Sequence, residues 1–165
     1  MKKRVFISFY FFVVIIFFSC GNNKIITEKN KLQTDTTFIT NNIVARNYFF
    51  NNNATPPNDR GEFVVDSQED FDKYFSPAAF MGKDGEPTKI DFSKQTALCI
   101  VLEESNILKR LDFIDITSKA EGSITCNYRL TLGQKQSYTT RPCLIVIVDK
   151  DKASKGVDFH RGFVR

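Results

Sequence analysis

The sequence predicts an α+β domain in which an antiparallel sheet of about six or seven strands carries one main helix. Short runs rich in β-branched and aromatic residues recur from Asn42 onward, and one amphipathic helical segment lies among them. The linkers after Ala120, Leu132 and Asp149 are short. Because short connections favour antiparallel neighbours, we expect the C-terminal strands to form a meander.

Hydrophobic pattern places the strands. They are expected at Asn42–Phe50, Gly61–Asp66, Thr96–Glu104, Arg110–Thr117, Ser123–Leu132, Pro142–Asp149 and Val157–Val164. The consecutive apolar residues of Thr96–Glu104 indicate a strand covered on both faces, and Pro142–Asp149 is expected to be central. The alternation in Arg110–Thr117 changes phase between Phe113 and Ile114, which predicts a β-bulge.

The segment Ser123–Leu132 alternates regularly between apolar and polar residues. One face carries Ile124, Cys126, Tyr128, Leu130 and Leu132, and the other carries Thr125, Asn127, Arg129 and Thr131. We expect the first face to be buried under the predicted helix.

That helix is predicted after Ser67, which is suited to be its N-cap, with Asp70 three residues on as in a capping box. Phe71, Tyr74 and Phe75 follow at helical spacing and form one apolar stripe.

The N-terminus has the parts of a secretory signal. Lys2, Lys3 and Arg4 precede the apolar run Val5–Phe18, which is shorter than the roughly 20 residues of a membrane-spanning helix. The following "FFSC" resembles the lipobox of bacterial lipoproteins, with Phe17 in place of the usual leucine. This implies cleavage before Cys20 and lipidation of its sulfur; an uncleaved anchor or an ordinary secretory signal is the alternative.

The expected organisation is therefore a signal peptide at 1–19, a lipidated cysteine and flexible tether at 20–41, and one globular domain at 42–165. Gly21 follows the cysteine where an aspartate would resemble an inner-membrane retention signal. We expect an outer-membrane lipid anchor with the domain facing the periplasm, surface exposure being the alternative. Within the tether, Asp35-Thr36-Thr37 resembles a short O-glycosylation motif of envelope proteins, with Thr36 as acceptor; an ordinary polar linker is the alternative.

Charge and residue content argue against several functions. The net charge is +4, but three cations lie in the signal, so the remaining chain is nearly balanced and has no electrostatic basis for binding nucleic acid. His160 is the sole histidine and no Cys-x-x-Cys occurs, so we expect no metal and no cofactor. The Asp149–Gly156 segment lacks the ligand pattern of a calcium loop, and no nucleophile elbow accompanies His160.

Three cysteines remain after Cys20, and all lie in predicted strands. Cys126 and Cys143 fall on candidate neighbouring strands, so a disulfide between them and packing as free apolar side chains are both open.

The polar stretch Gly133–Cys143 is the candidate binding surface. Lys135, Gln136, Tyr138 and Arg141 are expected to line a loop that leads into an apolar strand, because loops on a rigid sheet often carry binding residues. An ordinary hairpin loop, with Arg141 paired to a carboxylate, is the alternative.

Three stretches in order, "VVDSQEDFDKYF", "IDFSKQTALCIVLEE" and "RPCLIVIVDK", resemble small gram-negative envelope lipoproteins with a domain like the C-terminal domain of the protease-complex stabiliser PrcB. The resemblance covers Glu62 to Lys150 and implies a non-enzymatic, protein-binding role. We therefore expect a lipid-anchored module that binds an envelope protein or a ligand. The alternatives are an envelope structural or assembly factor, or a hydrolase without a recognisable motif.

Overall fold

A computed structural model describes residues 37–39, 41–79 and 85–164. Cys20 and Thr36 lie outside these residues. The described part is mostly β, with ten strands and two short helices, α1 (Gln68–Tyr74) and α2 (Lys150–Ala153). The antiparallel sheets are as expected. The expected α+β domain with one main helix is not confirmed, because the longer helix, α1, has only seven residues. Neither of these described helices is long and apolar enough to cross a membrane.

Two four-stranded sheets contain most of the strands. The outer sheet has the order β1 (Thr37–Ile39), β7 (Ser105–Ser118), β8 (Ile124–Thr140), β10 (Val157–Val164). The central sheet has the order β2 (Asn42–Val44), β9 (Cys143–Asp149), β6 (Gln95–Val101), β4 (Glu62–Val65). The short strands β3 (Tyr48–Phe50) and β5 (Phe75–Pro77) pair separately. All pairs are antiparallel except β8 with β10.

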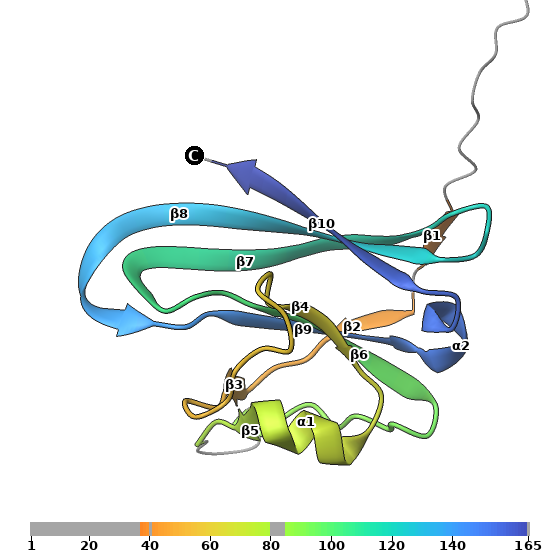
Figure 1. Cartoon of the computed structure of the whole chain (residues 1–165), viewed down its shortest axis with the longest axis horizontal. Coiled ribbons are helices and arrows are strands. Elements are labelled where there is room, and N and C mark those ends of the chain that lie inside the picture. The colour runs from red at the N-terminus through yellow and green to blue at the C-terminus, as the bar shows by residue number, and fades with distance from the viewer. Residues whose placement is uncertain (1–36, 40, 80–84, 165) are drawn as a thin grey trace, which may run out of the picture. The chain divides into compact units, whose positions relative to one another are not determined.

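The central sheet lies between the outer sheet and a layer formed by α1, β3 and β5 (Figure 1). Successive residues of β6 therefore enter two different cores. Ala97 and Cys99 pack with the aromatic residues of α1, β3 and β5, and Leu98 and Ile100 pack with the outer sheet. This confirms that both faces of β6 are covered and explains why its sequence lacks period-two alternation. The central position expected for Pro142–Asp149 is also confirmed, since β9 lies between β2 and β6.

The helix begins as expected. The Ser67 side chain accepts a hydrogen bond of 3.1 Å from the backbone N–H of Asp70. Phe71 and Phe75 are each only 1% exposed, and their rings stack 5.0 Å apart. They pack with Phe63 of β4 on the central sheet, so the expected contact of this stripe with Ser123–Leu132 is wrong.

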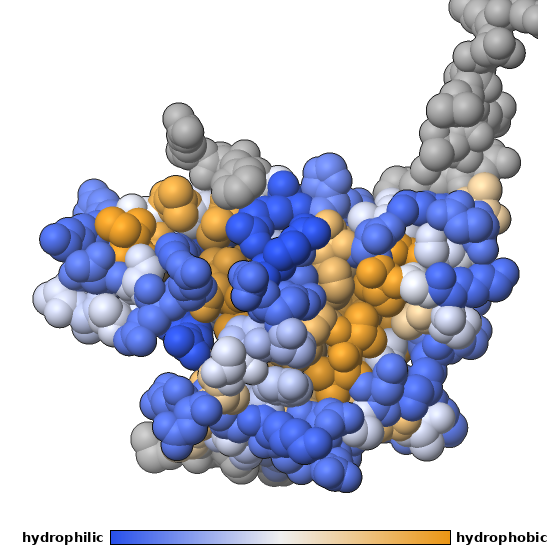
Figure 2. Space-filling view, in the orientation of Figure 1, coloured by the Kyte–Doolittle hydropathy of each residue, from blue (hydrophilic) through white to orange (hydrophobic). Residues whose placement is uncertain are grey.

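The alternating face of β8 is buried against the central sheet instead. Ile124, Cys126, Tyr128 and Leu130 are at most 6% exposed, as expected for a buried face. Leu132 is 46% exposed, because β7 and β8 continue past the end of the central sheet (Figure 1). Leu108 is also exposed there, and Figure 2 shows apolar side chains at this end of the β7–β8 ribbon.

The connections differ from the predicted meander. The segment after β6 crosses to the outer sheet, so β6 pairs with β4 and β9 rather than with β7, and β10 runs parallel to β8. The register shift between Phe113 and Asp115 confirms the predicted bulge. At the N-terminal side, Thr37–Ile39 form β1 and pair with β7, so these three residues of the segment 20–41, expected to be a tether, belong to the outer sheet.

Candidate functional site

A pocket of about 730 Å³ opens at the end of the two sheets where β6 leaves the central sheet. The loop before β4 forms one wall with Thr55, Asn58 and Arg60. The last residue of β6, Val101, and the two residues after it, Leu102 and Glu103, also line the pocket. Lys109 of β7, Leu130 of β8, Arg141 after β8 and Arg161 of β10 complete the lining. Its volume lies in the usual range for small-molecule pockets.

The loop wall is fixed by an unusually close backbone approach. Gly61 has φ +67°, and a Cβ built on it would lie 2.0 Å from the backbone oxygen of Val101. The Val101 N–H donates to the Gly61 oxygen at 2.7 Å. Glycine is therefore required for both conformation and space. The Asn58 side chain adds two hydrogen bonds to the Glu62 backbone, donating to its oxygen at 2.7 Å and accepting from its N–H at 3.4 Å.

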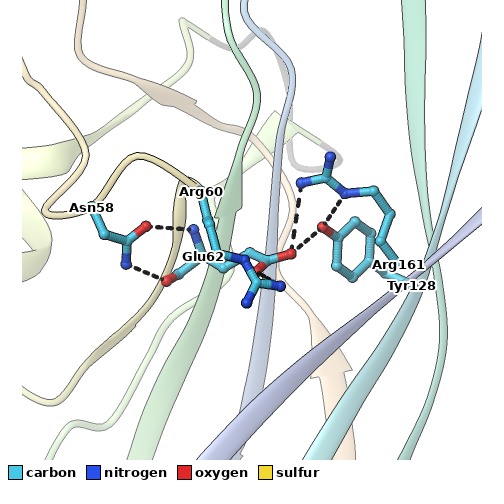
Figure 3. A network of polar contacts seen from close by, with 5 residues as sticks. All are labelled: Asn58, Arg60, Glu62, Tyr128 and Arg161. Carbon is cyan, nitrogen blue, oxygen red and sulfur yellow. Dashed lines mark hydrogen bonds and ion pairs between the residues drawn. The ribbon is translucent and has the colours of Figure 1, made fainter.

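These contacts place the Glu62 side chain inside the pocket wall, where it is 3% exposed. Tyr128 donates its hydroxyl proton to Glu62 Oε1 at 2.5 Å, and Arg161 Nε donates to the Tyr128 hydroxyl oxygen at 2.7 Å. Arg60 Nη2 lies 2.8 Å from Glu62 Oε2, and Arg161 Nη2 lies 3.6 Å from Oε1. Figure 3 shows the Glu62 carboxylate between Arg60 on one side and Tyr128 with Arg161 on the other.

We call Asn58, Arg60, Glu62, Tyr128 and Arg161 the Glu62 network. A buried carboxylate is costly unless it is paired and hydrogen-bonded, and this one has two guanidinium partners and a phenol donor. Burial, together with the hydrogen bond to Glu62, raises the pKa of Tyr128 to about 12. Tyr128 therefore remains a protonated donor at physiological pH. The network joins β4, β8 and β10, so it ties the two sheets together at the pocket.

Only one of the four residues predicted for the binding surface lines this pocket. Arg141 does, with its guanidinium carbon 5.6 Å from the centroid of the Phe50 ring. Lys135, Gln136 and Tyr138 do not, because Gly133–Thr140 continues β8 and is not a loop. Gln136 Nε2 donates instead to the Tyr138 hydroxyl at 2.9 Å, and Tyr138 is 58% exposed.

The sequence reasoning missed the Glu62 network, although a signal for it was present. Glu62 begins an otherwise apolar strand, and Arg161 shares the parity of Val157 and Phe159 on β10. Tyr128 likewise lies on the apolar face of β8. A carboxylate, a guanidinium and a phenol on inward faces require mutual partners when buried, and could have been grouped on that ground.

The cysteines of the described segments are free thiols. Cys126 lies in the outer sheet and Cys143 in the central sheet, so the two are not on neighbouring strands. Burial raises the pKa of Cys126 to about 12 and that of Cys143 to about 11, which makes both poor nucleophiles. Among the described residues no group of three or more His, Cys, Asp or Glu side chains is placed to hold a metal ion.

Comparison with protein-family models, with curated proteins and with solved structures gave no match. Fold and site together define a mostly β protein of two facing sheets with an arginine-lined pocket where the sheets end.

Proposed function

We propose that this chain is a lipid-anchored envelope protein that acts as a non-enzymatic binding module. Its ligand, or a segment of a partner protein, binds in the pocket beside the Glu62 network. The observation that carries the proposal is that the pocket wall is fixed by contacts within the protein itself. Gly61 and the Glu62 network fix the wall through backbone contacts and buried polar contacts, and such preorganisation lowers the entropic cost of binding.

The chemistry of the network supports binding rather than catalysis. A general acid or base works best with a pKa near the operating pH, whereas the pKa of Tyr128 is raised to about 12. The Glu62 carboxylate is engaged by Arg60, Arg161 and Tyr128. These contacts favour a role for the three partners of Glu62 in stabilising the wall of the pocket.

Cross-linking tests whether the pocket is occupied in the envelope. A photoreactive amino acid replaces Thr55 at the pocket, or Lys152 on α2, which is exposed and does not line the pocket. We expect an adduct, seen by intact mass, from position 55 but not from position 152. Equal labelling at both positions, or none at position 55, would refute the proposal.

The anchor is tested separately, because it depends on the N-terminal pattern. Cys20→Ala should prevent lipidation and leave either an unprocessed precursor or a product released from the outer membrane. Intact-mass analysis of the wild-type protein should find a cleaved chain with an acylated Cys20. An unmodified Cys20 in the mature protein would exclude the lipoprotein assignment without affecting the pocket.

The second candidate function is that of an envelope structural or assembly factor. It is favoured by the exposed apolar side chains at the end of the β7–β8 ribbon, where Leu108 is 44%, Leu132 46% and Tyr138 58% exposed. A photoreactive residue at Leu108 distinguishes the two functions. A protein adduct from position 108 together with no adduct from position 55 would favour the assembly role.

A further inference from the structure

The Glu62 network uses two of the four cationic side chains that line the pocket, Arg60 and Arg161. The other two, Lys109 and Arg141, make no ion pair within the described part of the chain. Lys109 Nζ lies 3.4 Å from the backbone oxygen of Glu103. The Arg141 guanidinium lies over the Phe50 ring, a contact that leaves its hydrogen-bond donors available.

Lys109 and Arg141 adjoin the same short segment, Leu102–Glu103. The backbone oxygen of Pro142, which follows Arg141, accepts a hydrogen bond of 3.0 Å from the Leu102 N–H. The Glu103 oxygen is the contact of Lys109. Two cations without a carboxylate partner therefore border one part of the pocket.

The charge of the lining limits the kind of anion. The lining contains four cationic side chains and three acidic ones, Asp59, Glu62 and Glu103, so its formal net charge is +1. A ligand with a single negative charge balances it, whereas a doubly charged phosphate would leave excess negative charge near Asp59 and Glu103. The planar guanidinium of Arg141 also matches a carboxylate geometrically.

The remaining lining indicates what the carboxylate belongs to. Leu102 and Leu130, exposed by 7% and 6%, offer a small apolar surface, too limited for a long hydrocarbon chain. Thr55 and the polar loop before β4 suit hydrogen-bonding groups such as amides. The volume of about 730 Å³ has room for much more than one carboxylate.

We propose that the pocket binds the free carboxyl terminus of a peptide chain. The terminal carboxylate contacts Arg141 and Lys109, and the last side chain, which is apolar, packs against Leu102 and Leu130. The inference rests on the proposed function, since it names the occupant of the same pocket.

Fluorescence anisotropy tests it with the full-length protein in detergent. The probes are fluorescein-labelled pentapeptides ending in alanine, valine or leucine, each as the free acid and as the C-terminal amide. We expect the free acid to bind about tenfold more tightly or better, because the amide lacks the charge-assisted hydrogen bonds. Arg141→Gln and Lys109→Gln should each abolish most of this preference.

Arg110→Gln is the matched control. Arg110 lies on β7, pairs with Asp112 and does not line the pocket, so this variant should keep the wild-type preference. Equal affinity for acid and amide, or no binding of any free-acid peptide, overturns the inference. Displacement of the peptide by inorganic phosphate at lower concentration than by acetate also overturns it, in favour of a phosphate site. If the position 55 cross-link persists in any of these cases, the proposed function stands and only the peptide terminus is wrong.

Discussion

Replacing Tyr128 by phenylalanine isolates the hydroxyl group that links the two sheets. The Tyr128 ring is fully buried, and its hydroxyl donates to Glu62 at 2.5 Å and accepts from Arg161 at 2.7 Å. Phenylalanine keeps the ring and removes both hydrogen bonds. A hydrogen bond to a charged group contributes about 1.5–3 kcal/mol, and both lost bonds are of this kind. We therefore expect Tyr128→Phe to lower the free energy of unfolding by about 1.5–3 kcal/mol or more.

Denaturant titration measures this loss, with Tyr138→Phe as the control. Tyr138 is 58% exposed, and its hydroxyl accepts one hydrogen bond from Gln136. Tyr138→Phe should therefore change the free energy of unfolding by no more than about 0.5 kcal/mol. If Tyr128→Phe costs no more than Tyr138→Phe, the Glu62 network does not stabilise the junction of the sheets, and our account of the pocket wall is wrong.

The pH dependence of the same variant gives an independent check. Burial raises the pKa of Tyr128 from 10.0 to about 12 in the folded protein. Below pH 10 the phenol is protonated in both states, so its contribution to stability is complete. Between pH 10 and 12 the unfolded chain loses this proton first, and the contribution declines. The stability difference between wild type and Tyr128→Phe should therefore shrink over this range; a constant difference would argue against the raised pKa.

Three further predictions concern the frame of the site. Gly61→Ala should cost about 1–3 kcal/mol or more in denaturant titration, because its Cβ would meet the neighbouring backbone and its φ is positive; an unchanged midpoint would refute the close approach. Leu130→Ala should cost about 2–5 kcal/mol and Arg129→Ala less than about 0.5 kcal/mol, and the reverse order would mean that the faces of β8 are exchanged. Cys99 and Cys126, both fully buried, should resist alkylation until denaturant is added, and rapid labelling of the native protein would contradict their burial.

The elements that the sequence predicted well are those whose pattern depends only on residues close together in the chain. Ser67 and Asp70 identified the start of α1, because capping needs only residues three apart. The phase change after Phe113 located a bulge, because alternation is a property of a single strand. The alternating face of β8 was likewise correct as far as Leu130.

What was not predictable depended on which strand lies against which. The sequence allows the aromatic stripe of α1 to pack directly on the apolar face of β8. In the structure the central sheet lies between them, so each packs against a different face of that sheet. Leu132 continues the apolar pattern of β8, yet it is exposed because no strand of the central sheet reaches it. Glu62 and Arg161 lie about a hundred residues apart in the chain, so no local pattern could have shown that they share a pocket wall.

The order of strands in the central sheet has a consequence for how the chain acquires its structure. Asn42 of β2 pairs with Val148 of β9, near the other end of the chain, and β9 also joins β6. Before β9 is available, the central sheet can contain only the β4–β6 pair. Pairings between such distant segments slow folding, and unpaired apolar strands are prone to aggregate meanwhile. A chain that is made N-terminus first must therefore release β9 before its central sheet can be completed.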